Sequence, residues 1–594
     1  MKLYCLSLFF VINLLFYPQT LSAQCPTGGV TFNNQMEVDT YVATYPDCTE
    51  INGSLKISGD SISNIAGLDS IKVVFGDLVV NNNDLLQDLQ GLDQLFSVTG
   101  NMTIKSNDAL KTLTGLDKLG YVGGFINITY NDSLQNLNGL SLVPFTLSKL
   151  YLQFNDRLTD ISALNLRYAK DDVLVTDNPL LTSLAGLDKL DRIEGDLVIG
   201  YNPSLTSFNS FDSLQFISKN LEIFDNEALT SFDAFERLEW IAGSFYCYRN
   251  IAISSLSELN PLDSIQEIIY INGNTSLVNL AGLENIKSLK SRLTIDDNPA
   301  LIDLSGLSNL SRVDGAVNIR NNLNLKNLNG LEQLTAIGDF LNIVNNPSLV
   351  SLDGLEQLDQ LGGSLLLSGN KSLQSLDGLA QLEQIVEDLE IYDNDSLRVL
   401  TGLQNLNNIA GDLRIEANDT LLQLDAFAQL NTIGGSLFLL ENTNLSQLNG
   451  FDHSMTIGEN LYVTKNSQLS NCAAQGICDY LATTINGDFD FSQNLADCKN
   501  LARVYSACSI VSVEETLLNQ QVKVFPNPTS GNINLTLPTE RRVQQISVFD
   551  HLGRTVFQTS QVSHQLDLSF LPGGLYILRL QIEEFNVQKK IILE

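Results

Sequence analysis

Hydrophobic and polar residues recur in a unit of 24 positions over most of the chain. The unit has the form L-x-I-x-x-N-x-x-L-x-x-L-x-G-L-x-x-L-x-x-I-x-G-x, as in LNIVNNPSLVSLDGLEQLDQLGGS. Its L-x-I segment has the two-residue period of a strand with one buried face, and its later apolar positions fall at every third residue. This repeat predicts a solenoid whose coils stack into parallel sheets.

One asparagine marks each coil. Its spacing is 24 residues, apart from one step of 23 between Asn155 and Asn178. Asp60 stands in the corresponding place of an earlier coil, which gives eighteen coils. Because the asparagine side chain can bond the backbone of its own coil and of the next, we expect a structural ladder. Its members include Asn83, Asn107, Asn131, Asn202, Asn298, Asn346, Asn394 and Asn442.

A solenoid needs a cover at each end. At the N-terminal end, the segment NNQMEVDTYVATYPDC predicts a helix that follows an asparagine cap. Its apolar face would carry Val38, Tyr41, Val42 and Tyr45. At the other end, residues 471–508 predict a second cap that is rich in cysteine.

Cysteine positions support both caps. Cys25 and Cys48 bracket the first cap and are a candidate disulfide. The candidates in the second cap are Cys472, Cys478, Cys498 and Cys508, for which three pairings are open. Cys247 occupies a strand position where other coils carry Ile or Val, so we expect a buried, unpaired thiol.

The N-terminus has the pattern of a signal peptide. Lys2 precedes an apolar run over residues 6–16, and QTLSAQ suggests cleavage after Ala23. The run is too short to span a bilayer comfortably, and no later segment has the pattern of a transmembrane helix. We therefore expect an exported chain in which disulfides persist.

The net charge of −34 is unevenly distributed. Residues 523–594 carry seven Lys and Arg against six Asp and Glu, so the acidic excess lies before them. Such a field disfavours nucleic acid as a partner. The simplest interpretation of these carboxylates is a solvated acidic surface.

The last part of the chain has a different pattern. Segments such as VKVFPNPTSGNINLTL, QQISVFDHLGRTVFQ and GLYILRLQIEEFNVQKKIILE alternate apolar and polar residues between Pro- and Gly-rich turns. They predict a small antiparallel β-sandwich, joined to the solenoid by the linker SIVSVEETLLNQQ.

Both parts resemble known families. Patterns such as GDLVIGYNPSLTSF and LDGLEQLDQLGGSLLLSGN are similar to the receptor L domain, a relative of the leucine-rich repeats, over residues 50–470. FPNPTSG, DHLGRTVF, LPGGLYILRL and KKIILE, in that order, resemble the type A sorting domain of the type IX secretion system. The first resemblance implies a binding or scaffolding module. The second implies a partner in the secretion machinery at the outer membrane, removal of the module, and release or lipopolysaccharide anchoring of the remainder.

We therefore predict an all-β protein of a Gram-negative bacterium that is secreted or held at the outer cell surface. It consists of a parallel β-solenoid with capped ends and a small antiparallel β-sandwich. The boundaries are a signal peptide (1–23), an N-terminal cap (24–52), the repeat solenoid (53–470), a disulfide-rich cap (471–508), a linker (509–521) and the sorting domain (522–594).

No sequence motif of a known enzyme class is present, and the chain has three histidines. The acidic candidates for catalysis are Asp296, Asp297 and Asp393. We expect a binding and adhesion scaffold rather than an enzyme, with no cofactor and no metal. The alternative is a carbohydrate-active hydrolase or lyase on the same β-solenoid.

A ligand site is expected on the outer sheet face. In L-x-I-x the two x positions face solvent, and successive coils place four rings at these positions. This pattern predicts an exposed aromatic patch of several hundred Å². A glycan or a protein would contact this patch. The expected site consists of Phe224, Tyr246, Tyr248 and Tyr270, with Glu222 and Asn272 offering hydrogen bonds. Tyr151, Phe154 and Tyr201 would extend it. The alternative is that the rings only stabilise neighbouring strands.

Overall fold

The computed structural model describes residues 25–140, 145–483, 487–508, 519–537, 542–550, 553–561, 563–582 and 585–594. The expected signal peptide and most of the linker lie outside these residues. The chain forms two compact units, Met1–Ala300 and Leu301–Glu594. Nearly all of the regular structure is β, as the sequence predicts.

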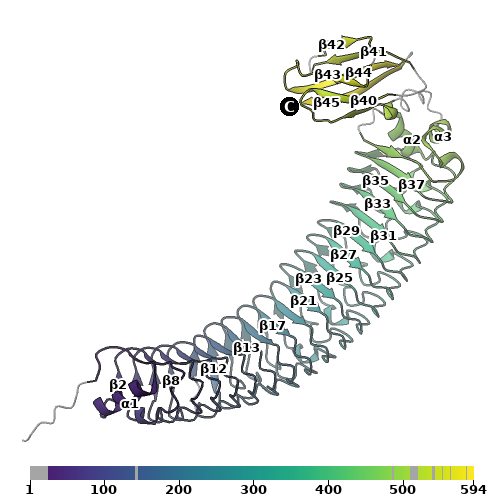
Figure 1. The fold of residues 1–594 in the computed structure, drawn as a ribbon. Coiled ribbons are helices and arrows are strands. Elements are labelled where there is room, and N and C mark those ends of the chain that lie inside the picture. The colour runs from purple at the N-terminus through teal and green to yellow at the C-terminus, as the bar shows by residue number, and fades with distance from the viewer. Residues whose placement is uncertain are drawn as a thin grey trace, which may run out of the picture. The chain divides into compact units, whose positions relative to one another are not determined.

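The first unit is a stack of coils, each of which contributes one strand to a parallel sheet (Figure 1). Leu and Ile of the L-x-I segments point inward and are fully buried, which confirms the predicted face. The strands are β1 (Val30–Phe32), β3 (Leu55–Ile57), β5 (Leu78–Asn81), β7 (Met102–Lys105), β9 (Ile126–Thr129), β11 (Leu150–Gln153), β13 (Val173–Thr176), β15 (Leu197–Gly200), β17 (Leu221–Phe224), β19 (Phe245–Tyr248), β21 (Ile269–Asn272) and β23 (Leu293–Asp296).

Short strands form further parallel sheets along the coils of the first unit. They cover the stretch just before each glycine pair or its equivalent. They are β2 (Glu50–Ile51), β4 (Val73–Val74), β6 (Ser97–Val98), β8 (Tyr121–Val122), β10 (Phe145–Leu147), β12 (Leu166–Ala169), β14 (Arg192–Ile193), β16 (Phe216–Ile217), β18 (Trp240–Ile241), β20 (Ser264–Ile265) and β22 (Ser288–Leu289).

The second unit continues the same coil pattern and ends in the β-sandwich. Its long strands are β25 (Val317–Arg320), β27 (Leu341–Val344), β29 (Leu365–Ser368), β31 (Leu389–Tyr392), β33 (Leu413–Glu416), β35 (Leu437–Leu440), β37 (Leu461–Thr464) and β38 (Phe489–Asp490). Its short strands are β24 (Arg312–Val313), β26 (Ala336–Ile337), β28 (Gln360–Leu361), β30 (Gln384–Ile385), β32 (Asn408–Ile409), β34 (Thr432–Ile433) and β36 (Thr456–Ile457).

The asparagine ladder is buried and fully hydrogen-bonded. The side-chain amide of Asn346 donates to the carbonyl oxygens of Ile319 (2.9 Å) and Val344 (3.2 Å). Its side-chain oxygen accepts the backbone N–H of Asn322 at 3.0 Å, and its own N–H donates to the side chain of Asn370 at 3.1 Å. Each asparagine thus satisfies backbone groups of two coils, as predicted.

The first rung of the ladder differs from the prediction. Asp60 is exposed, and the side-chain oxygen of Asn83 instead accepts the backbone N–H of Gly59 at 3.0 Å. Asp60 is therefore not a rung, because Gly59 holds the place 24 residues before Asn83 and makes the ladder bond.

Both predicted caps are present. Helix α1 (Gln35–Thr44) begins after Asn34, whose side-chain oxygen accepts the N–H of Glu37, and it buries Val38 and Tyr41. The other end is covered by α2 (Gln475–Ala482) and α3 (Leu501–Ala507). Within the described residues, no helix combines the length and hydropathy needed to cross a membrane.

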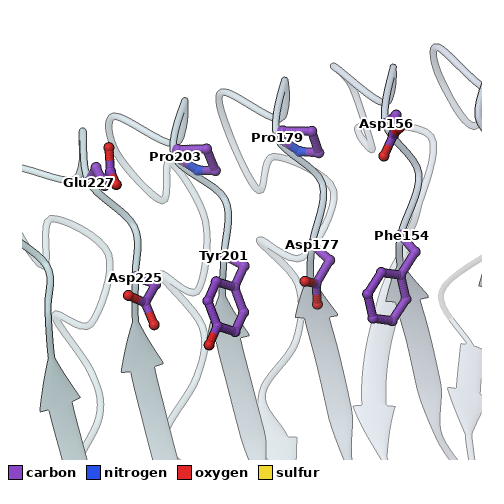
Figure 2. A pocket seen from close by; sticks show the side chains of 8 residues that line it. All are labelled: Phe154, Asp156, Asp177, Pro179, Tyr201, Pro203, Asp225 and Glu227. Carbon is purple, nitrogen blue, oxygen red and sulfur yellow. The ribbon is translucent and has the colours of Figure 1, made fainter.

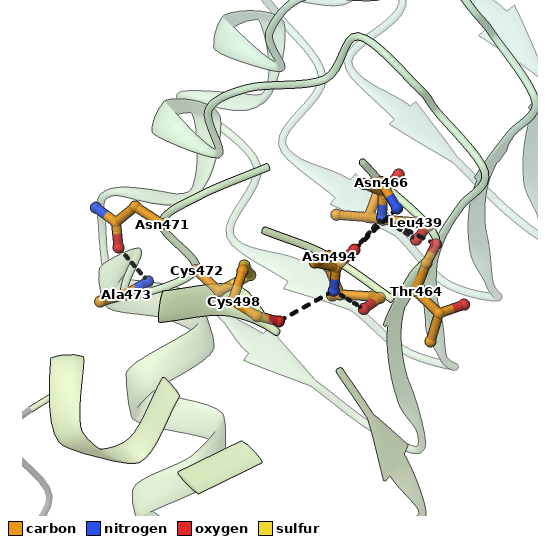
Figure 3. Close-up of a disulfide and its surroundings, with 9 residues drawn as sticks. Leu439, Thr464, Asn466, Asn471, Cys472, Ala473, Asn494 and Cys498 are labelled. Carbon is orange, nitrogen blue, oxygen red and sulfur yellow. Dashed lines mark hydrogen bonds between the residues drawn. A yellow bond between two sulfur atoms is a disulfide. The ribbon is translucent and has the colours of Figure 1, made fainter. Parts of the chain in front are cut away.

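The disulfides settle the pairing that the sequence left open. Cys25 is bonded to Cys48, and the second cap has the bonds Cys472–Cys498 and Cys478–Cys508. Next to the Cys472–Cys498 bond, Asn494 forms a last rung of the ladder (Figure 3). Its side-chain oxygen accepts the N–H of Asn466 at 2.9 Å, so the cap closes the ladder as well as the core.

The C-terminal module has two antiparallel sheets around its own core, which confirms the predicted sandwich. One sheet has the order β39-β40-β43 and the other β42-β41-β44-β45. The bounds are β39 (Lys523–Phe525), β40 (Asn532–Thr536), β41 (Val543–Phe549), β42 (Thr555–Thr559), β43 (Gln565–Asp567), β44 (Gly574–Ile582) and β45 (Phe585–Leu593).

Candidate functional site

The six predicted site residues lie together on the outer sheet face of the first unit. Parallel pairing of β17, β19 and β21 aligns them in two rows. We call this set the ring face. One row is Glu222, Tyr246 and Tyr270, and the other is Phe224, Tyr248 and Asn272.

The rings of the ring face contact one another. Phe224 and Tyr248 are stacked with centroids 4.8 Å apart and planes 6° from parallel. Tyr270 lies 6.0 Å from Tyr246 and 6.1 Å from Tyr248. The ring of Phe224 also lies over Gly200, where a Cβ would come within 2.4 Å of it. Glycine at this outward position therefore makes room for the ring.

The rings are less exposed than the sequence suggests. All six side chains of the ring face are half-buried, because each ring covers part of the next. Phe154 and Tyr201, by contrast, are exposed at 38% and 47%. Tyr201 meets the edge of Phe224 at 5.2 Å and so extends the ring face, whereas Tyr151 packs against Phe125 at 6.2 Å.

Partial burial also shifts the titration of two groups. It raises the pKa of Tyr248 to about 12, and the neighbouring Glu222 and Asp225 carboxylates add to that shift. Burial likewise raises the pKa of Glu222, with a further contribution from Asp196. The phenol of Tyr248 is therefore harder to ionise than a free phenol, and it remains a hydrogen-bond donor beside a ring surface over a wider pH range.

The buried side of the same coils is also distinctive. Phe208, Phe211, Phe232 and Phe235 replace leucines and pack in one fully buried cluster. Cys247 is buried and unpaired as predicted, and burial raises the pKa of its thiol to about 12. The thiol is therefore an inert part of the core.

A groove lies at the bend that follows β11, β13, β15 and β17 (Figure 2). We call it the acidic groove, and its volume is about 420 Å³. It is lined by Phe154, Asp156, Asp177, Pro179, Tyr201, Pro203, Asp225 and Glu227. Apart from Phe154 and Tyr201, sequence reasoning missed these residues. The sequence could have indicated them, because the groove residues directly precede or follow four consecutive ladder asparagines.

The acidic candidates for catalysis lie in different surroundings. Asp296 is half-buried at the end of β23, and Asp297 is exposed in the following bend at φ 54°. Asp393 belongs to the second unit, where its carboxylate accepts a hydrogen bond from Lys371 at 2.9 Å. Among the described residues, no group of three or more His, Cys, Asp or Glu side chains is arranged to hold a metal ion.

In the C-terminal module, the first and last sequence motifs are bonded together. The side chain of Asn527 donates to the carbonyl of Lys590 at 2.9 Å and accepts the N–H of Ile592 at 2.8 Å. Thr529 exchanges backbone bonds of 3.0 and 2.9 Å with Ile592 and Glu594. FPNPTSG thus fixes the strand that carries KKIILE.

The other two motifs make contacts within themselves. In DHLGRTVF, the carboxylate of Asp550 accepts the N–H and the guanidinium Nε of Arg554, at 2.9 and 2.7 Å. In LPGGLYILRL, the hydroxyl of Tyr576 donates to the carbonyl of Pro572 at 2.8 Å. Lys589 and Lys590 lie on β45, the edge strand of its sheet, as expected. Burial lowers the pKa of Lys589.

Comparison with known families supports both resemblances. Residues 47–188 and 189–302 match the receptor L domain, and residues 523–594 match the secretion system C-terminal sorting domain. No curated protein matches the chain. Residues 47–302 are therefore built of receptor L repeats, a fold that suggests a binding scaffold. The C-terminal module is a type IX sorting domain, which implies export and contact with the secretion machinery.

Proposed function

We propose that this chain is a binding and adhesion protein, exported by the type IX system and then released or anchored at the outer surface of a Gram-negative cell. The ring face would contact a polysaccharide or another protein. After export, the sorting domain would be removed. The stacked, half-exposed rings of Phe224 and Tyr248, with Tyr246 and Tyr270 beside them, carry this proposal.

Two features support a ligand-binding role over a packing role for the rings. The phenols and Glu222 place polar groups beside the ring surfaces, the combination that recognises sugars and polar protein segments. In addition, Tyr201 extends the rings into solvent at 47% exposure, where it buries little. A hydrolase or lyase has less support, because Asp297 is exposed in a bend and Asp393 is paired with Lys371.

The experiment is a binding screen of the purified chain against glycan and protein arrays. Each ligand found is then tested with the ring variant, in which Tyr246, Tyr248 and Tyr270 are changed together to Ser. Loss of binding supports the ring face. The matched control changes Asn342, Leu366 and Glu390 to Ser. These half-buried residues hold the outward position of β27, β29 and β31 that Tyr246 and Tyr270 hold in β19 and β21. Equal binding by the ring variant and the control would contradict the proposal.

A further inference from the structure

The acidic groove offers a regular series of groups to a ligand. Phe154, Asp177, Tyr201 and Asp225 each directly precede a ladder asparagine, and Figure 2 shows them as a row along successive coils. A second row, on the other side of the bend, consists of Asp156, Pro179, Pro203 and Glu227. With coils about 4.8 Å apart, a ligand that follows the first row meets ring, carboxylate, ring and carboxylate in turn.

The backbone at the first row is unfavourable for aromatic residues. Phe154 and Tyr201 have φ of 55° and 51°, in the left-handed region that suits Asn, Asp and Gly. Asn82 and Gly273 occupy the same place in other coils of this unit. Tyr130 adopts the same conformation one coil earlier, so this backbone belongs to the bend of every coil. Phe154 is stacked on Tyr130 at 4.6 Å and Tyr201 meets Phe224 at 5.2 Å, and both rings line the groove.

Three of the four carboxylates that line the groove have no cationic partner among the described residues, and the fourth, Asp225, is paired with Arg249. Asp177 is half-buried and stands between Phe154 and Tyr201 in the row. Within the part of the chain that the structure describes, Asp156, Asp177 and Glu227 form no ion pair. The groove therefore combines ring surfaces with uncompensated negative charge.

One coil further along, an arginine of the chain itself contacts a carboxylate and a ring at the same time. The guanidinium of Arg249 reaches the carboxylate of Asp225 at 2.5 Å and lies over the ring of Tyr248 at 5.5 Å. Arg249 occupies the same place in its coil as Asp177 and Tyr201 do in theirs. A guanidinium satisfies a carboxylate and a ring together, because it is both charged and planar.

We propose that the acidic groove binds an arginine side chain on an extended segment of a partner protein. The guanidinium sits at Asp177 between the rings of Phe154 and Tyr201, and Asp156 and Glu227 attract further cationic residues of the segment. This inference rests on the proposed binding function and gives the chemistry of one partner.

The test measures binding of a fluorescent hexa-arginine peptide to the full chain at physiological salt. Asp177→Asn is expected to weaken the Kd about tenfold or more, the effect of losing one charged hydrogen bond. Tyr201→Ser should weaken it by a smaller factor. Both substitutions suit the backbone, since Asn82 and Ser106 hold this place in other coils.

Asp297→Asn is the matched control. Asp297 has the same charge and φ of 54° in its own coil, but the preceding coil carries Gly273 in place of a ring. Its loss should change the Kd less than about twofold, as expected for one surface charge. Equal weakening by Asp177→Asn and Asp297→Asn would overturn the proposal, because binding would then follow net charge alone.

Neutral cellohexaose, tested in parallel, separates a glycan from a peptide. Binding of cellohexaose that depends on Tyr201 but not on Asp177 would also overturn the proposal. If Asp177→Asn has no effect while the Tyr246/Tyr248/Tyr270 variant loses its ligands, the groove assignment is wrong and the proposed function stands. If the groove variants behave as expected while that variant keeps its ligands, the ring face assignment is wrong and the groove stands.

Discussion

The coils around Asn226 and those around Asn346 share the asparagine ladder and have different surfaces. The side-chain amide of Asn226 donates to Ile199 and Phe224 carbonyls, at 3.0 and 2.9 Å. Asn346 makes the corresponding bonds to Ile319 and Val344 at 2.9 and 3.2 Å. On the outer face, the first set carries stacked rings and the second does not.

This difference shows which positions the repeat leaves free. A ladder residue is fixed because losing it leaves buried backbone groups of two coils unpaired. The outward positions only need to suit a strand, so Tyr246 and Asn342 occupy equivalent places. Stability should therefore depend on the ladder, and binding on the outward residues. The sorting domain should affect neither stability nor binding, and should instead control export of the chain.

Deletion of residues 523–594 should have the largest effect. The truncated chain loses all four sorting motifs, so we expect it to accumulate in the periplasm with its binding activity intact. Cell fractionation and a binding assay on the periplasmic protein check both parts. The ring variant serves as the control and should be exported normally. Surface delivery of the truncated chain would refute the role of the module.

Asn346→Ala should have the next largest effect. It removes the side-chain partner of the Ile319 carbonyl and of the Asn322 N–H, and one of the two bonds to the Val344 carbonyl. The expected cost is roughly 1 to 3 kcal/mol in the free energy of unfolding. Since long repeat arrays do not unfold in a single step, hydrogen exchange at the neighbouring coils is the suitable measurement. Protection unchanged from that of the original chain would mean that the ladder is dispensable.

Titration of Tyr248 should have the smallest effect. Its pKa is raised to about 12 by partial burial and by nearby carboxylates, so the folded state favours the neutral phenol. This contribution to stability is complete below the pKa of the unfolded chain, near 10, and is lost as the pH rises through about 12. The difference in near-ultraviolet absorbance between the original chain and Tyr248→Phe isolates this titration. If this difference gave a tyrosine pKa near the ordinary value, Tyr248 would not be partly buried beside the carboxylates.

The sequence predicted the fold well because one physical requirement recurs in every coil. The buried L-x-I positions and the asparagines could be identified without a structure, and so could helix α1 behind Asn34. The pairing Cys472–Cys498 could not, because it depends on how α2 and α3 fold back. Asn494 was missed because it follows Asn466 by 28 residues instead of 24.

The site was only partly predictable. The alternation of inward and outward positions in L-x-I-x predicted correctly that the six residues of the ring face lie together on the outer face. The register of neighbouring strands in a regular solenoid follows from the repeat. The alternation could not show that the rings shield one another, because the tilt of Phe224 over Gly200 depends on side-chain packing. The acidic groove was missed since the backbone turns to positive φ before each asparagine, where strand alternation no longer applies.

We expect that the ladder determines stability and that the outer face determines binding. The most direct test measures both the melting temperature and the ligand binding of the Tyr246/Tyr248/Tyr270→Ser variant. The Asn342/Leu366/Glu390→Ser chain provides the reference. We predict that the two variants melt within a few degrees of each other and that only the ring variant loses its ligand. A ring variant that melts far below the reference and still binds would contradict the account, because the rings would then serve packing alone.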